Sequence, residues 1–329
     1  MNGPELKPEG EMPAESAPKE IFGFGDTAKY ESPDKSVWAA TNKGGRELTE
    51  GRKEANEDGY RVVDDKFLAV GDGVGGGRHG AEVCELVLRT LDPTENMNRI
   101  FHDACVNMQR AKFGPREGTM LALAREYQDG DEHGIEVGHV GDAKIHVLDA
   151  ETGEIIYASE DQSSLNDVVN VQHTRKEVIK AIRALKIIFY PEICDDELSD
   201  LTDEQVTTEA VKLQIKNSPT SYVNPDKLQF EAIIKKIPVA NRPVVVLLSS
   251  DGFHGIVSDT EISEYVKTHK KDAPKKLYEL AMERQAQLKI CEEQKLGTEG
   301  KPKVKVGGSL ITATKVHPDN VTLAAKWVG

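Results

Sequence analysis

The chain has 329 residues, enough to bury the core of one large domain or two ordinary ones. Its hydrophobic content of 38% and charged content of 30% are typical of a globular, water-exposed protein. The formal net charge of −14 argues against nucleic acid and against an anionic membrane surface as partners, because both would repel the chain. The longest strongly apolar run, residues 244–248, is too short to span a bilayer.

The cysteines and the N-terminus indicate the compartment. Four cysteines lie far apart with no CxxC pair, which argues against a zinc site or a disulfide framework and favours reduced thiols. No basic region followed by an apolar stretch opens the chain, so no secretory signal is visible. Residues 1–20 are rich in Pro, Glu and Lys, and we expect a disordered tail there. We therefore predict a cytoplasmic protein.

From residue 36 to residue 328 the pattern predicts one domain in which strands and amphipathic helices follow one another. A hairpin is expected around Asp64-Asp65, and a helix from about Ala81 follows a strand and a glycine-rich turn at 71–77. Further strands are expected within 36–42, 119–127, 135–142, 143–149, 244–252 and 321–328, and a long helix within 274–293. This order of elements predicts a layered α+β sandwich.

Capping residues predict where other helices begin. Thr94 is the expected N-cap of a helix that Gly114-Pro115 ends. Ser258 with Glu261 predicts a capping box at the start of another helix. Residues 163–220 interrupt the strand-rich pattern, and Thr174-x-x-Glu177 resembles a third capped helix. We expect a helical insertion in this region.

Aspartates mark the ends of three apolar strands. FLAVGD ends at Asp72, IEVGHVGD at Asp142 and VVVLLSSD at Asp251, whereas Asp319 stands just before the strand VTLAA. One such aspartate is usually a solvated turn residue. Four of them, three beside a glycine, indicate that these strand ends converge on one site.

Converging carboxylates repel one another unless cations neutralise them. The candidate ligands are hard oxygens, which suit Mg²⁺ or Mn²⁺ better than zinc. Asp72, Asp251, Asp319 and Glu57 would supply four negative charges, which two divalent ions balance. Such ions can activate a water molecule and polarise a phosphoryl group. Taken alone, the glycine turn after Asp72 leaves three possibilities open: a phosphate cradle, a metal-binding turn or a purely structural turn.

Seven segments, taken in chain order, resemble the type 2C, metal-dependent Ser/Thr protein phosphatases (the PPM family). Each segment alone is a weak signal, but seven in the correct order are specific, and DGVGG is closer to the bacterial-type members. The segments are KEANED (53–58), FLAVGDGVGG (67–76), GTMLALA (118–124), VGHVGDAKIHVL (137–148), DQSSL (161–165), VVVLLSSDGFHGIVSDTEI (244–262) and DNVTLAA (319–325).

The resemblance implies a four-layer α-β-β-α sandwich of two antiparallel sheets flanked by helices. It also implies hydrolysis of phosphoserine or phosphothreonine in proteins by a metal-activated water, without a covalent enzyme intermediate. Asp72 would bridge the two ions, and Gly73 would offer its carbonyl. The other implied ligands are Asp251 and Asp319 directly, Glu57 and Asp58 through water, and Asp142 at a third, weaker site.

This chain departs from the family pattern in three places. Val74 stands where many animal members have a histidine that is a candidate general acid. The phosphate-binding arginine of the family corresponds to Lys53, with Arg52 beside it; lysine offers a point charge where arginine offers a bidentate fork. Residues 163–220 match poorly and would form the variable flap beside the site.

We therefore predict a phosphatase that acts on a phosphoprotein, with Asp72 and Asp251 as its central catalytic carboxylates, and we expect a monomer. The alternative is a catalytically inactive phosphatase fold that serves as a binding or regulatory module. A nucleotide-binding protein is a third possibility, but GDGVGGGRHG lacks both a P-loop Lys-Ser/Thr and a spaced GxGxxG. His79 is expected to be a solvated first-turn residue and not a general acid.

Overall fold

The computed structural model describes residues 18–43, 56–74, 79–114, 117–162, 222–225, 232–239, 242–293, 303–306, 309–312 and 319–329. Three sequence predictions lie outside these ranges. They are residues 1–17 of the disordered tail expected over 1–20, the helical insertion at 163–220, and the choice between Arg52 and Lys53 as the phosphate-binding residue; Glu20, at the end of that tail, instead begins a strand.

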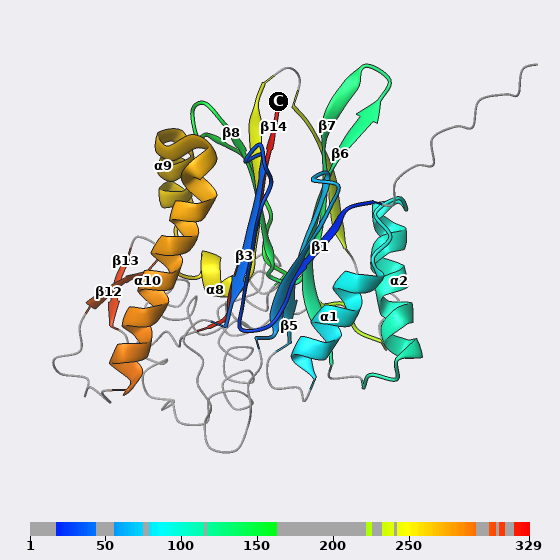
Figure 1. Cartoon of the computed structure of the whole chain (residues 1–329), viewed down its shortest axis with the longest axis horizontal. Helices are drawn as coiled ribbons and strands as arrows, with labels where there is room; N and C mark the ends of the chain where they lie inside the picture. Colours follow the sequence, from blue (N-terminus) through cyan, green and yellow to red (C-terminus); the bar gives the residue numbers. More distant parts are fainter. Residues whose placement is uncertain are drawn as a thin grey trace, which may run out of the picture.

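Two antiparallel sheets, each with six strands among the described residues, face each other (Figure 1). In spatial order, the first sheet contains β1 (Glu20–Gly23), β4 (Asp58–Val63), β5 (Phe67–Gly73), β6 (Thr119–Asp129), β7 (Glu132–Val140) and β10 (Ile233–Pro238). The second contains β2 (Thr27–Glu31), β3 (Val37–Asn42), β14 (Val321–Val328), β11 (Val244–Ser249), β8 (Lys144–Asp149) and β9 (Ile155–Ala158). A separate hairpin pairs β12 (Lys303–Val306) with β13 (Ser309–Thr312).

The strands are apolar on both faces because each sheet packs on the other sheet with one face and on helices with the opposite face. In β5, Leu68 and Val70 point into the core between the sheets, whereas Phe67 and Ala69 point to the helices on the outside. Side chains alternate along a strand, so this division follows from sequence position alone. A strand buried on both faces loses the polar alternation that marks a surface strand, which explains the continuous apolar run FLAV.

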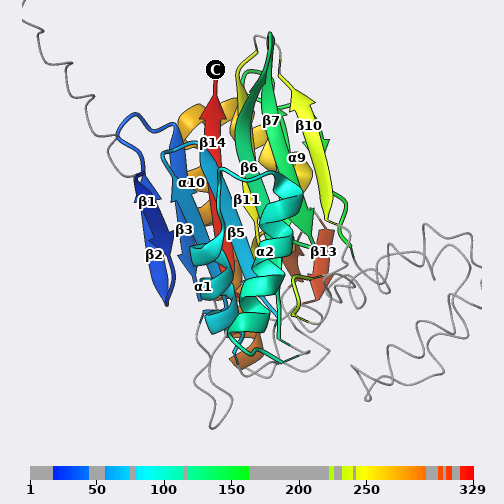
Figure 2. The same ribbon diagram turned by 90° about the vertical axis from the view of Figure 1, so that its right-hand side faces the viewer.

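Helices cover the outer face of each sheet. The helices α1 (Gly80–Thr90) and α2 (Met97–Arg110) pack on the first sheet, as Figure 2 shows. The helices α9 (Asp259–His269) and α10 (Ala273–Glu293), joined by a 3₁₀ turn at Lys270–Asp272, pack on the second, together with the short α8 (Asp251–His254). The predicted α-β-β-α sandwich is therefore confirmed.

Local signals in the sequence set several boundaries. The predicted capping box at α9 is present: Ser258 Oγ accepts from the Glu261 amide, and the Glu261 carboxylate accepts from the Ser258 amide. Asp64 and Asp65 adopt positive φ angles of 49° and 54° in the turn between β4 and β5, where a hairpin was predicted.

The predicted boundaries of α2 are wrong at both ends. Thr94 is not the N-cap, because its hydroxyl donates to Asp92 Oδ1 at 2.6 Å. Asn96 caps the helix instead, through a bond of 2.9 Å from the Arg99 amide to its Oδ1. At the other end the helix stops at Arg110, before Gly114-Pro115, and its C-cap amide (Ala111) bonds back into the last turn.

The fold begins earlier in the chain than residue 36. The strands β1 and β2 add an edge to each sheet, and Ile21, Ala28 and Tyr30 pack against the core between the sheets. Glu20 accepts from the buried guanidinium of Arg61 at 2.9 Å. Both strands are short, and β2 alternates between exposed and half-buried residues, so their apolar signal is weak.

Two further features concern the environment of the chain. Within the described ranges, no helix combines the length and apolar character needed to cross a bilayer. Cys84 and Cys105 take part in no disulfide bond and are buried between the first sheet and its helices.

A pair of truncations tests the earlier start of the domain. Deletion of residues 1–31 removes β1 and β2 and exposes the edges of β3 and β4. We expect it to lower the free energy of unfolding by about 2 kcal/mol or more and to promote aggregation. Deletion of residues 1–17 keeps every described element and is the control. Thermal unfolding and light scattering provide the measurements; equal melting temperatures for the two truncations would restore a domain boundary near residue 36.

Candidate functional site

The predicted aspartates lie at strand ends on one side of the sandwich, where β5 ends and β14 begins; β14 runs from there to the C-terminus at the opposite end (Figure 1). The strands β5 and β7 run in the same direction in the first sheet, so Asp72 and Asp142 lie at the same edge. The chain then passes from β7 directly into β8 of the second sheet. There β11 ends beside the start of β14, which brings Asp251 and Asp319 to this end as well.

The pleat of β5 decides where the Asp72 carboxylate points. Asp72 follows Leu68 and Val70 at intervals of two, so its side chain emerges on the face that looks toward the second sheet. Only 6% of Asp72 is exposed. Its register partner on β4 is Asp58, which is also buried. Two buried carboxyl groups therefore lie side by side on adjacent strands, at the end of the core between the sheets.

The electrostatics of Asp72 show that the predicted residues share one region. Burial raises the pKa of Asp72 well above its ordinary value, and the charges of Asp58, Asp251, Asp142 and Asp319 raise it further. Carboxylates act on one another in this way only when they are close in a poorly hydrated environment. The structure therefore places the other four aspartates near enough to Asp72, at the same end of the sandwich, for their charges to act on it.

The segments that carry Asp251 and Asp319 touch directly. A Cβ added at Gly252 would lie 1.7 Å from the carbonyl oxygen of Asn320 and 3.2 Å from Cβ of Asp319. Only a residue without a side chain permits this approach. Ser250, just before Asp251, donates its amide to the Thr322 carbonyl and accepts the Thr322 amide on its hydroxyl, at 3.1 and 3.0 Å.

Glycines also bring Glu57 against the end of β5. The Gly73 amide donates to the Glu57 carbonyl at 3.0 Å. A Cβ at Gly80, the first residue of α1, would meet Glu57 Oε1 at 2.4 Å. The Glu57 carboxylate thus packs at the positive end of a helix, where a negative charge is favoured. Glu57 lies in the same acidic region as Asp58 and Asp72. Burial raises the pKa of Cys84 most, and the charges of these three residues raise it further.

Asp142 lies in a tight turn between the two sheets and is buried. Gly141 has a φ of +87°, which favours glycine. Gln162 fixes this glycine from both sides: its side-chain oxygen accepts the Gly141 amide at 2.8 Å, and its own amide donates to the Gly141 carbonyl at 2.9 Å. Next to it, Lys144 pairs with Asp161 at 2.8 Å. Asp161 and Gln162, the two described residues of the DQSSL segment, therefore support the Asp142 turn.

A chain of uncharged side chains ties the two sheets together beneath the aspartates. Asn56 accepts the Asp58 amide at 3.1 Å and donates to Thr41 Oγ1 at 2.8 Å. The hydroxyl of Thr41 contacts that of Thr322 at 2.7 Å. Asn56 lies within the matched segment KEANED but was not among the predicted site residues.

Asn320 provides a second link of the same kind. Its Oδ1 accepts the Glu57 amide at 3.1 Å, and its Nδ2 donates to the Lys43 carbonyl at 2.8 Å. Asn320 lies within the matched segment DNVTLAA, and this position was the one feature of the sequence that could have indicated its role at the site. Asn56 and Asn320 each hold the backbone of an acidic residue without adding charge to the site.

The residues fit a divalent cation in donor type and in charge. Asp72 Oδ2 is buried and accepts no hydrogen bond from any described residue. A buried carboxylate oxygen without a donor is costly unless a cation neutralises it. The candidate donors are all oxygens, as Mg²⁺ and Mn²⁺ require. Among the described residues, however, no three carboxylate, imidazole or thiolate groups stand close enough together to form an assembled metal-binding cluster.

His79 and Val74 take positions that differ in chemistry. His79 is the N-cap residue of α1 but forms no side-chain cap; its Nδ1 lies 2.7 Å from Glu82 Oε2 on the surface. Val74 packs against the core between the sheets, and its amide donates to the Gly118 carbonyl at 3.0 Å. Val74 therefore supplies an apolar contact at the position where animal members would have a histidine.

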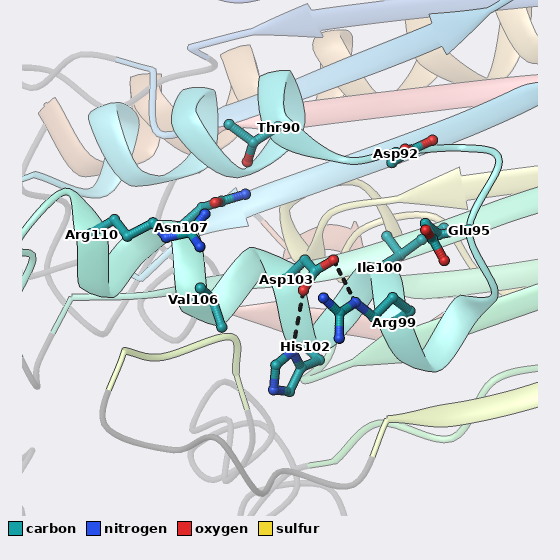
Figure 3. A pocket seen from close by; sticks show the side chains of 10 residues that line it. All are labelled: Thr90, Asp92, Glu95, Arg99, Ile100, His102, Asp103, Val106, Asn107 and Arg110. Carbon is teal, nitrogen blue, oxygen red and sulfur yellow. Dashed lines mark hydrogen bonds and ion pairs between the residues drawn. The ribbon is translucent and has the colours of Figure 1, made fainter.

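A hollow of about 390 Å³ lies away from the aspartates, along the outer side of α1 and α2 (Figure 3). Charged side chains on its wall pair with one another: Arg99 donates to Asp103 at 2.8 Å, and His102 lies 3.2 Å from the same carboxylate. These pairs are largely solvent-exposed, and none of the sequence-predicted site residues lines the hollow. The candidate site is therefore the aspartate cluster.

Comparison with known proteins identifies the fold class. The chain has the fold of the PPM Ser/Thr phosphatases, as its likeness to solved structures shows. The PPM Ser-Thr phosphatase MsPP from Mycobacterium smegmatis, solved with cacodylate, superimposes with a TM-score of 0.54, 17% identity and coverage of 89% of this chain and 98% of that chain. The serine/threonine phosphatase Stp1 from Staphylococcus aureus gives 0.51 and 17%, with coverage of 89% and 94%.

A bacterial serine phosphatase gives a TM-score of 0.52 at 16% identity, with coverage of 89% of this chain and 97% of that chain. No family model matches the sequence, and no curated protein matches it either. At such low identities the likeness establishes the fold, and the chemistry has to be argued from the residues.

Replacement of Asp72 tests the electrostatics of the cluster. Because the pKa of Asp72 is raised on folding, the metal-free protein loses stability as the pH rises from about 4 through the folded pKa. We expect Asp72→Asn to raise the free energy of unfolding in chelator at pH 7.5 by about 1–3 kcal/mol and to change it little near pH 4.

The control for this prediction is Asp129→Asn, which changes an exposed aspartate to the same amide. It should leave the free energy of unfolding within about 0.5 kcal/mol at both pH values. Thermal unfolding in chelator measures both variants. A destabilised Asp72→Asn variant at pH 7.5 would show that the Asp72 charge is already compensated within the protein.

Proposed function

We propose that this protein is a divalent-metal-dependent phosphatase that hydrolyses phosphoserine or phosphothreonine in proteins. The observation that carries the proposal is the gathering of Asp58, Asp142, Asp251 and Asp319 around the buried Asp72. The fold that the chain shares with PPM Ser/Thr phosphatases supports the same conclusion. A set of hard oxygen donors at the mouth of a rigid sandwich suits phosphoryl chemistry with Mg²⁺ or Mn²⁺.

In this proposal Asp72 would help to hold both ions, and Gly73 would offer its carbonyl as a further ligand. Asp251 and Asp319 would serve as direct ligands, and Glu57 and Asp58 would act through water. When bound, the ions supply the positive charge that offsets the carboxylates, activates a water molecule and polarises the phosphoryl group. Asp142 is assigned to a third, weaker site.

The chain's own residues position the two sides of the site and the substrate phosphate. Asp72 and Asp251 come from different sheets, so they hold the two sides of the site at a separation fixed by the sandwich. Val74 contributes no proton, so either a water molecule at the site protonates the leaving group or the alkoxide leaves unaided and is protonated by solvent. Arg52 or Lys53 is proposed to bind the substrate phosphate. A cytoplasmic monomer remains our prediction from the sequence.

The inactive binding module is the less favoured alternative. A phosphatase fold that had lost catalysis would be expected to lack part of its carboxylate set. Here every predicted aspartate is present and contributes to the field at Asp72. Retention of mutually repelling buried carboxylates is unfavourable for folding, and cation binding provides the reason to keep them.

The activity test uses the purified full-length chain with a chromogenic aryl phosphate and a phosphothreonine peptide. We expect hydrolysis with Mn²⁺ and loss of the activity in chelator. Asp251→Asn should lower kcat/KM by at least about 100-fold, which corresponds to about 2.7 kcal/mol of transition-state stabilisation.

Asp129→Asn is again the matched control and should retain full activity. An Asp251→Asn variant as active as this control would rule out the proposed ligand set. Binding of the phosphopeptide without release of phosphate by the unaltered chain would favour the inactive module.

A further inference from the structure

Gln285 is a polar residue at an apolar position of α10. It lies one turn before Leu288 and one turn after Ala281, on the stripe that packs on the second sheet. Only 1% of Gln285 is exposed. A buried amide destabilises a fold unless its donor and acceptor are both satisfied. The contacts of Gln285 therefore explain why glutamine occupies this position.

Both ends of the Gln285 amide bond to the backbone of the candidate metal-binding segments. Its Nε2 donates to the Gly252 carbonyl at 2.9 Å, and its Oε1 accepts the Asp319 amide at 2.9 Å. Gly252 follows Asp251 directly. One side chain thus joins the segment of Asp251 to that of Asp319, which are 33 and 34 residues away from it in the sequence.

The site needs such a clamp because its two carboxylates repel each other. Asp251 and Asp319 both act on Asp72, and Gly252 lies against the Asn320 carbonyl and close to the Asp319 side chain. A neutral amide can hold both segments without changing the charge that a cation would meet. A glutamate would add a charge, and a leucine would leave the Gly252 carbonyl and the Asp319 amide without this partner.

We propose that Gln285 is a positioning residue that sets the separation of Asp251 and Asp319 for a shared divalent cation. The inference rests on the proposed function, because it assigns a role toward the metal that this function requires. Gln285 does not touch the cation; it acts through the two backbone groups. Residues that orient metal ligands in this way commonly change affinity when they are replaced.

The test is Mn²⁺ binding to the full-length protein, measured by isothermal titration calorimetry after removal of metal. Gln285→Met keeps the length and most of the volume of the side chain but removes both hydrogen bonds. We expect its Mn²⁺ affinity to fall about 10–100-fold. The matched control is Gln287→Met on the same helix, where the glutamine is exposed and bonds only weakly to Glu283, at 3.4 Å. Its Mn²⁺ affinity should match that of the unaltered chain.

A double-mutant cycle separates positioning from general stability. If Gln285 acts through Asp319, the loss caused by Gln285→Met should largely disappear in an Asp319→Asn background, because that ligand is already removed. Thermal unfolding in chelator reports the structural contribution separately. Should Gln285→Met not fold, Gln285→Asn, which withdraws the same amide by one methylene, replaces it with the same expectation.

The outcomes are distinct. A Gln285→Met protein with a lower melting temperature but unchanged Mn²⁺ affinity would overturn the inference and leave the proposed function intact. Equal losses in the two backgrounds would overturn it as well. Absence of Mn²⁺ binding by the unaltered chain would overturn both the inference and the proposed function.

Discussion

The mutual repulsion of five aspartates at one end of the sandwich is the constraint on which the rest of the site depends. Burial and the neighbouring charges raise the pKa of Asp72, so the folded chain bears an electrostatic penalty wherever these groups ionise. Backbone contacts and neutral side chains hold the acidic segments together despite this repulsion. Gly252 allows the segments of Asp251 and Asp319 to touch, Asn320 accepts the Glu57 amide, and Gln285 bonds to the segments of both Asp251 and Asp319. The scaffold thus holds the acidic segments in place without neutralising their charge.

The topology explains why residues so distant in sequence meet. The strands β5 and β7 are parallel to each other within an antiparallel sheet, so they end at the same edge. The turn at Asp142 then leads into the second sheet, where β8 and β11 pair in opposite directions. Consequently β11 ends at the same end of the molecule at which β8 begins. This arrangement brings the ends of both sheets together. A helix layer on the outer face of each sheet packs the two sheets in place.

The sequence predicted the layers and the acidic residues because their signals are local. Apolar runs such as FLAV, a glycine beside an aspartate, and the Ser258–Glu261 box depend only on neighbouring residues. The short edge strands β1 and β2 were missed because half-buried, polar positions carry little periodic signal. Thr94 was misassigned because its hydroxyl bonds to Asp92 instead. Gln285 was missed for a different reason. Its partners, Gly252 and Asp319, are distant in sequence and come close only in the folded chain, so the pattern of residues within α10 does not predict the contact.

The position of β14 has a consequence for how the protein acquires its site during synthesis. This last described strand lies in the middle of the second sheet, between β3 and β11, and Thr41 meets Thr322 across 281 residues of chain. Until β14 has left the ribosome, the second sheet is divided into two halves, and Asp319 cannot pack against Gly252. A nascent chain should therefore form its first sheet, with α1 and α2, before the proposed cation site is complete. Such long-range pairing favours slow, late folding, so cation binding would report that the whole sandwich has closed.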